Sequence, residues 1–169
     1  LGSGSGDVLA AISGARQSRS GRIIYNGESF LAKSPKEAIA RGIAYCSDDR
    51  KLDGLFLGRP IIENLTSPAL GAISNRGIID LKAERDLALS NGTKFTVDVT
   101  RLDNEAGVLS GGNQQKVALG KWLAIKPKII LVNEPTRGVD VGARAEIYAK
   151  LRDLANDGAA VVFASTEIQ

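Results

Sequence analysis

The sequence contains no histidine and a single cysteine, Cys46. Without histidine, the chain has no imidazole for a serine-type catalytic triad or a histidine-ligated zinc site. One thiol can form neither an internal disulfide nor a metal site built from several thiolates. Because Cys46 lies within an apolar run, we expect it to be a small buried core residue.

Aromatic residues and long apolar stretches are also scarce. Phenylalanine, tryptophan and tyrosine make up 5% of the chain, and the net charge of +3 is spread along it rather than gathered in a basic stripe. We therefore expect no nucleic-acid partner, which would need such a stripe together with stacking aromatics. The longest apolar runs, 129–132 and 159–164, are far shorter than the roughly 18 residues that cross a bilayer.

The remaining composition is that of one globular α/β domain. Of the 169 residues, 43% are apolar and 24% are charged, which suits a domain with a buried core. Continuous apolar runs predict buried strands at 43–46, 129–132 and 159–164. Helices are predicted at 7–12, 34–42, 110–125 and 142–155. Apolar strands that alternate with helices are typical of a parallel sheet covered by helices on both faces.

Turn and cap residues predict how the first elements are joined. After a β-rich run at 22–25, Asn26-Gly27 is a strong hairpin turn. Ser34 and Glu37 predict a helix start with a capping box, in which each side chain accepts a hydrogen bond from the other residue's backbone N–H.

The middle of the chain, from about 48 to 106, lacks strand patterns. Helical patches such as 81–89 alternate there with turns, so we expect a mainly helical insertion. The chain also begins in a glycine-rich loop with no strand before it and stops soon after a predicted strand. We therefore expect it to be part of a longer domain, incomplete at both ends.

A serine followed by two glycines opens the helix predicted at 110–125. The run reads Leu109-Ser110-Gly111-Gly112-Asn113-Gln114-Gln115-Lys116. Glycines at a helix start expose backbone N–H groups, and the helix dipole behind them favours an anion. Taken alone, the same run also suits an ordinary serine-capped helix.

A second polar motif follows the apolar strand predicted at 129–132. It reads Asn133-Glu134-Pro135-Thr136-Arg137-Gly138-Val139-Asp140. A carboxylate at the end of a buried parallel strand lies where such folds bind ligands. Glu134 could orient a water for attack on a phosphate, because phosphoryl transfer depends mainly on positioning and charge stabilisation. The alternative is a Glu-Pro turn that simply ends the strand.

These motifs together resemble the ATP-binding cassette (ABC) family. The blocks 49–55, 110–116 and 136–143 narrow the resemblance to the second cassette of the double-cassette ATPases that drive importers of simple sugars such as ribose, xylose and galactose. The resemblance covers the whole chain. It implies a P-loop NTPase-like α/β fold, with a mostly parallel sheet flanked by helices and an inserted helical subdomain. It also implies that 1–169 is a partial nucleotide-binding domain, in which about 55–107 forms the helical subdomain and the groove that faces a transport domain.

The resemblance places the end of the phosphate-binding loop at the start of the chain. The residues concerned are Gly2, Ser3, Gly4, Ser5, Gly6 and Asp7. That loop needs a lysine for the β- and γ-phosphates and then a Ser or Thr hydroxyl for Mg²⁺, but these positions are Ser5 and Gly6. The glycine N–H groups could still cradle a phosphate. The alternative is a flexible glycine-serine loop.

Three further positions depart from the family pattern. The glutamine linked to Mg²⁺ is replaced by Asp48, the aspartate before the catalytic glutamate by Asn133, and the histidine that contacts the γ-phosphate by Thr166. Asp48 and Asn133 are accordingly weak candidates for a magnesium site. The catalytic Glu134 and the loop aspartate Asp140 match the pattern, and the resemblance implies that Asp140 contacts the nucleotide.

The resemblance implies an asymmetric pair of ATP sites. In the family, two cassettes close head to tail, and each ATP lies between the phosphate loop of one and the signature of the other. We therefore expect Ser110, Gly111 and Gly112, with Asn113 and Gln114, to serve ATP and Mg²⁺ held mainly by a partner cassette. The other expected partners are membrane-spanning permease subunits and, indirectly, a solute-binding protein, with the chain peripheral at the cytoplasmic face of the membrane.

Two alternatives remain open at this point. The chain could be a non-hydrolytic cassette half with a regulatory or structural role. It could also be a soluble cassette protein that acts on ribosomes or DNA, but the block 136–140 disfavours this because ribosome-acting cassettes usually carry Asn-His-Leu-Asp there. The sugar is not specified by this sequence, because in the family its selection lies in the membrane and solute-binding subunits.

Overall fold

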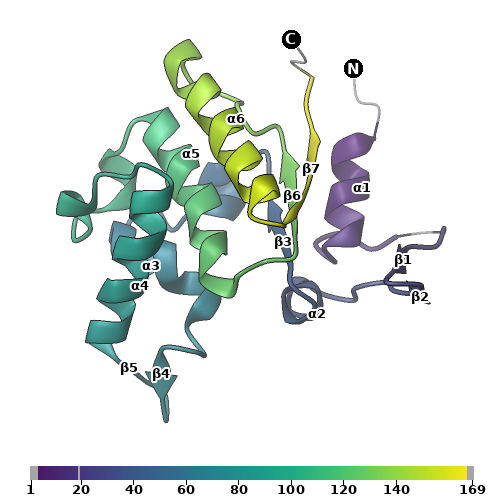
Figure 1. Cartoon of the computed structure of the whole chain (residues 1–169), viewed down its shortest axis with the longest axis horizontal. Coiled ribbons are helices and arrows are strands. Elements are labelled where there is room, and N and C mark those ends of the chain that lie inside the picture. The colour runs from purple at the N-terminus through teal and green to yellow at the C-terminus, as the bar shows by residue number, and fades with distance from the viewer. Residues whose placement is uncertain (1–3, 19, 167–169) are drawn as a thin grey trace.

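The computed structural model describes residues 4–18 and 20–166. Its central sheet has three parallel strands in the order β3 (Ile43–Cys46), β6 (Ile129–Asn133) and β7 (Ala160–Ala164). Ile43 lies opposite Ile129, and Ile129 lies opposite Ala160. In Figure 1 the helix α1 (Ser5–Ile12) lies on one side of this sheet, and α6 (Val141–Asn156) lies on the other. The predicted parallel α/β sheet is thus confirmed.

The strands differ in how deeply they are buried. The side chains of β3 and β6 are largely buried, as their continuous apolar runs predict. The prediction that the last strand is fully buried is wrong, because Val162 and Phe163 are 45% and 48% exposed. Within the described residues β7 pairs only with β6, so it is an edge strand whose side chains are partly uncovered.

Residues with positive φ mark where the first helix and the first hairpin turn occur. The first helix begins at Ser5, because Gly4 adopts a left-handed conformation (φ +74°) and its carbonyl accepts a hydrogen bond from Val8 N at 3.0 Å. The strands β1 (Ile24–Tyr25) and β2 (Glu28–Ser29) form the predicted hairpin. Both of its turn residues have positive φ, as a two-residue turn of this type requires.

The helix α2 (Pro35–Ala40) has only half of the predicted capping box. The Ser34 hydroxyl accepts a hydrogen bond from Glu37 N at 3.4 Å, as expected. The Glu37 carboxylate, however, accepts from Lys33 N at 2.9 Å rather than from the backbone of Ser34. The chain then turns at Gly42, whose φ of +80° ends the helical path before β3.

The segment after β3 is mainly helical, as predicted. Its helical elements are a π-helical turn η1 (Arg50–Gly54), α3 (Ile61–Thr66), η2 (Ser67–Ala69), α4 (Leu81–Lys94), η3 (Val99–Arg101) and η4 (Ala106–Val108). The expectation that this segment contains no strand is wrong. A small hairpin joins β4 (Ser74–Asn75) to β5 (Ile78–Ile79), because Arg76 and Gly77 both take positive φ in the turn between them.

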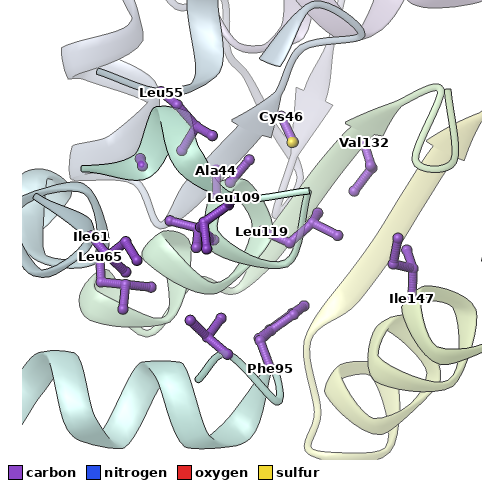
Figure 2. Close-up of a cluster of buried hydrophobic side chains, with 14 of the residues drawn as sticks. Ala44, Cys46, Leu55, Ile61, Leu65, Phe95, Leu109, Leu119, Val132 and Ile147 are labelled. Carbon is purple, nitrogen blue, oxygen red and sulfur yellow. The ribbon is translucent and has the colours of Figure 1, made fainter. Parts of the chain in front are cut away.

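The helix predicted at 110–125 is an α-helix, α5 (Gly111–Gly120), followed by a 3₁₀ segment, η5 (Lys121–Ile125). Figure 2 shows that the core packs around this helix, with Leu119 between Phe95 and the sheet residue Val132. The central segment and the sheet therefore share one hydrophobic core. None of the helices in the described part of the chain combines the length and apolar character that crossing a bilayer requires.

Cys46 is buried in this core, as predicted. Burial raises the pKa of its thiol to about 11, so the neutral form predominates near neutral pH. A second, smaller core lies on the other face of the sheet, where Leu9 of α1 and Ala38 of α2 pack against Ile43 and Leu131. The two cores hold the carboxyl ends of the strands in a fixed arrangement.

Candidate nucleotide cavity and signature helix

A cavity of about 560 Å³ lies between the start of α1 and the carboxyl ends of the sheet strands. Its lining includes Gly4, Ser5, Gly6, Asp7, Asp48, Asn133, Glu134 and Thr166. These segments lie far apart in the sequence, and the sheet brings them together at the edge where parallel strands commonly bind ligands. The candidate residues Gly2 and Ser3 lie outside the described residues.

The start of α1 packs tightly against the strand that carries Asn133. A Cβ atom added at Gly6 would lie 2.7 and 2.8 Å from the two side-chain heteroatoms of Asn133. No lysine is found among the described residues that line the cavity. Ser5 and Gly6, the two positions for which the resemblance predicts a lysine and a hydroxyl, thus bring no cation to the cavity.

Asp48 has both carboxylate oxygens engaged within the protein. Oδ1 accepts a hydrogen bond from Asn133 Nδ2 at 3.1 Å, and Oδ2 accepts one from the guanidinium of Arg137. Residues 4–18 and 20–166 contain no group of three or more acidic, histidine or cysteine side chains placed to hold a metal. Asp48 and Asn133, the weak candidates for a magnesium site, thus bond each other, and Asp48 is also paired with a guanidinium.

Glu134 is held at the end of β6 by two backbone contacts to the end of the neighbouring strand β7. Its N–H donates to Ala164 O at 2.8 Å, and its carboxylate accepts a hydrogen bond from Thr166 N at 2.8 Å. Its φ of +49° lies in the left-handed region, which is uncommon for a residue with a side chain. The carboxylate therefore has a fixed position on the cavity wall.

The cavity has a negative electrostatic character. Among the described residues, its titratable lining includes the carboxylates of Asp7, Asp48, Asp53 and Glu134 and a single guanidinium, that of Arg16, which is paired with Asp7. Burial raises the pKa of the lining residue Tyr45, so its phenol is neutral. Because Asp7 and Asp48 are each paired with an arginine, a triphosphate placed here would face mainly the carboxylates of Asp53 and Glu134.

Several residues that line the cavity were not predicted from the sequence. Arg16, Tyr45, Ser47 and Asp53 all face the cavity, and Ser47 donates a hydrogen bond to Asp53 at 3.0 Å. Tyr45 and Ser47 could have been proposed from the sequence, because they flank the carboxyl end of a predicted parallel strand. Arg16 and Asp53 carry no such local signal.

The signature residues form a second group, on α5. Ser110 is exposed, and its hydroxyl caps the helix by accepting from Asn113 N at 3.4 Å. Gln114 is buried, and its amide donates to Ala106 O at 3.5 Å. The described lining of the cavity includes none of the residues 110–114. The candidate residues thus fall into two spatially separate sets.

Asp140 belongs with the signature rather than with the cavity. Its carboxylate caps α6 by accepting from Ala143 N at 3.0 Å. A Cβ atom added at Gly112 would lie 2.9 Å from Ala143 Cβ and 3.4 Å from Asp140 Oδ2. The start of α5 therefore packs directly on the start of α6.

Comparison with known proteins identifies the family. A model of the ABC transporter family matches residues 2–137, and the chain belongs to this family. The ribose import ATP-binding protein RbsA of Geobacillus kaustophilus is 43% identical over 168 residues, which cover 99% of this chain and 34% of the relative. A putative ribose/galactose/methyl galactoside import ATP-binding protein of Agrobacterium fabrum is 41% identical over 169 residues, which cover 99% of this chain and 34% of that relative. The chain thus spans about a third of the length of these curated relatives.

Solved structures show the same fold. A dimeric bacterial ABC transporter cassette matches with a TM-score of 0.80 at 23% identity, over 99% of this chain and 72% of that one. A cassette in a post-hydrolysis state, bound to ADP and phosphate, matches with a TM-score of 0.77 at 26% identity, over 98% and 72%. The predicted P-loop NTPase-like α/β fold is confirmed.

Proposed function

We propose that this chain is part of the ATPase that energises a simple-sugar importer, and that it donates its signature to ATP held by a partner cassette while its own cavity binds nucleotide weakly. The family and the names of the sugar-import relatives support the general function. The observation that carries the asymmetry is Asp48, whose carboxylate is bound to Asn133 and Arg137 beside a cavity whose described lining contains no lysine.

The weakness of the chain's own cavity follows from the groups that it lacks. Ser5 brings no cation to the phosphates, Gly6 no hydroxyl, and Thr166 no imidazole. Each such contact is worth several kcal/mol of transition-state stabilisation in enzymes where single donors have been removed, about 2.7–4 kcal/mol. The carboxylates around the cavity add repulsion toward a triphosphate.

The signature helix retains the features that suit a donated phosphate contact. Ser110 is exposed at the start of α5, and no side chain at position 111 or 112 covers the helix end. Backbone N–H groups there can face an anion that arrives from outside the domain. In this proposal ATP and Mg²⁺ are held mainly by the partner cassette.

The remaining partners follow from the sugar-import relatives. We place the chain at the cytoplasmic face of the membrane, against permease subunits that receive sugar from a solute-binding protein. Residues of about 55–107, which form mainly helices, are the proposed helical subdomain and transport-domain-facing groove.

A non-hydrolytic regulatory half is the second candidate function. The contacts of Asp48 favour it, since pairing with the Arg137 guanidinium weakens the attraction of this carboxylate for a cation. The two candidates differ in whether Glu134 contributes to turnover at all.

Two substitutions in the full-length ATPase, assembled with its permease, test the proposal. Ser110→Arg places bulk and charge at the signature and should abolish most ATP hydrolysis. Glu134→Gln alters only the impaired cavity and should leave most turnover in place. Ser29→Arg, at an exposed serine of β2, is the matched control and should retain full activity.

Each outcome bears on a different part of the proposal. If Glu134→Gln stops hydrolysis as completely as Ser110→Arg, the asymmetric model fails, and Glu134 is a working base. If Ser110→Arg leaves hydrolysis intact, the signature is not donated to a competent site. Complete tolerance of Glu134→Gln would favour the non-hydrolytic candidate over residual activity at this cavity.

A further inference from the structure

Two arginines link the loop after β3 to the loop after β6 in opposite directions. The guanidinium of Arg137 bonds the carboxylate of Asp48. Arg50 lies two residues after Asp48. Its guanidinium donates to Arg137 O at 2.7 Å and to Gly138 O at 3.3 Å. The two loops are therefore joined by side chains from both sides.

Arg50 is buried to an extent unusual for a charged residue. Its relative exposure is 9%, and its hydrogen bonds go to backbone carbonyls. Within the described residues its Nε is buried without a hydrogen-bond partner. In the described part of the chain no carboxylate is hydrogen-bonded to this guanidinium, so its burial costs free energy, which favours a role that a smaller apolar side chain would not fill.

The signature helix begins directly on this contact. A Cβ atom added at Gly111 would lie 2.8 Å from Gly138 O and 2.9 Å from Arg50 Nη2. Only glycine at this position lets the helix approach so closely. Any shift of the Arg50 side chain or of the Gly138 carbonyl would therefore displace the first turn of α5.

The segment that carries Arg50 is also attached to the other end of α5. Lys121 Nζ donates to the carbonyl of Gly54, the last residue of η1. A Cβ added at Gly54 would lie 3.2 Å from Arg50 Cβ and 3.9 Å from Ala118 Cβ. The turn η1 thus lies along α5 and connects it to the cavity residue Asp48.

From these contacts we infer that Arg50 is a positioning residue, which sets the place of the signature N–H groups by holding the Gly138 carbonyl against Gly111. The inference rests on the proposed function, because it concerns the signature's contact with a partner's ATP. It also links the chain's own cavity to the partner's site, since Asp48 and Arg50 lie on the same loop and both bind residue 137.

The test uses the full-length ATPase with its permease and compares Arg50→Met, Arg50→Lys and Arg22→Met. Methionine keeps much of the length of Arg50 but donates no hydrogen bond, so kcat/KM for ATP should fall about ten- to a hundredfold, the order expected for a small misplacement of a binding group. Lysine can reach one carbonyl and should recover part of that loss. Arg22, an exposed arginine before β1 and outside the cavity, the signature and the proposed groove, is the matched control and should keep full activity.

Activity is measured per folded complex, with thermal melting recorded for every variant. If Arg50→Met lowers the melting temperature but leaves kcat and KM unchanged per folded complex, Arg50 is only structural and the inference is overturned. A lysine variant as impaired as the methionine variant, at equal folding, would overturn it as well.

Ser110→Arg, measured alongside, distinguishes a failure of the Arg50 inference from a failure of the proposed function. If it abolishes turnover while Arg50→Met does not, the inference alone fails. If Ser110→Arg leaves turnover intact, the proposed function itself fails.

Discussion

Gly6 and Asn133, two positions at which the sequence departs from the ABC pattern, lie in contact in the structure. The missing Cβ at position 6 is what allows the Asn133 side chain to lie where it does. From there Asn133 reaches Asp48, a third departure from the pattern, with a hydrogen bond of 3.1 Å. The altered residues therefore depend on one another, and restoring one of them alone should not rebuild the site.

Gly6→Ser tests this dependence. We expect the serine to destabilise the chain by about 1–3 kcal/mol, as overpacking in a tight site does, even though serine is the better helix former. Urea denaturation gives the free energy of unfolding. Adding Asn133→Ala should remove most of the penalty, as coupling between contacting residues predicts.

Gly58→Ser is the matched control, because a Cβ at Gly58 would have no atom within 4 Å. If Gly6→Ser proves as harmless as this control, Asn133 moves aside freely and the two positions are independent.

At the scale of elements, the signature helix is positioned by helix caps and close packing. Ser110 caps α5, Asp140 caps α6, and the two helix starts meet at Gly112. Asp140 was predicted to contact nucleotide, but the structure gives its carboxylate a local partner, the N–H of Ala143. Its geometry supports a role in placing α6 beside the signature.

Removal of the Asp140 cap should destabilise α6, and the size of the effect should depend on whether the new side chain can still accept the hydrogen bond from Ala143 N. Asp140→Ala should lower the free energy of unfolding by about 1 kcal/mol, whereas Asp140→Asn should be nearly neutral, because asparagine is an equally good cap. Chemical denaturation of both variants gives the comparison. Asp157→Ala, at the carboxyl end of the same helix, should not destabilise, since an acidic group is unfavourable there. Equal damage from asparagine and alanine would show that the charge of Asp140 matters rather than its cap.

At the scale of the whole molecule, the fold separates two kinds of chemistry. The cavity at the end of the sheet contains Glu134 but no phosphate-binding lysine among its described residues, while the signature lies on a helix that does not line it. A single copy of the chain therefore does not assemble both halves of an ATP site. This arrangement suits a partner that supplies the missing half.

The chain alone should bind Mg-ATP poorly. Calorimetric titration is expected to show a dissociation constant well above about 1 μM, which corresponds to roughly −8 kcal/mol. Ser5→Lys restores a cation beside the glycine N–H groups and should tighten binding about tenfold, as one charge-assisted contact would. Tight binding by the unmodified chain would contradict the impaired cavity, however the variant behaves.

The sequence by itself determined the elements whose signal is local. The buried strands at β3 and β6 follow from short apolar runs, and the hairpin at Asn26-Gly27 follows from the backbone freedom of its turn residues. The helix start at Ser110 follows from its cap and glycines in the same way. Each of these features depends on neighbours within a few residues, so the amino-acid sequence is sufficient to predict it.

Only the tertiary structure decided which side chains meet. Asp48 bonds Asn133 and Arg137, which lie 85 and 89 positions further along the chain. Arg50 bonds the carbonyl of Arg137, which lies 87 positions further along. No periodicity or turn signal records such contacts, because they depend on how the parallel strands align the loops at their carboxyl ends. The exposure of β7 was decided at the same level, since an apolar strand is buried only where neighbouring strands and helices cover it.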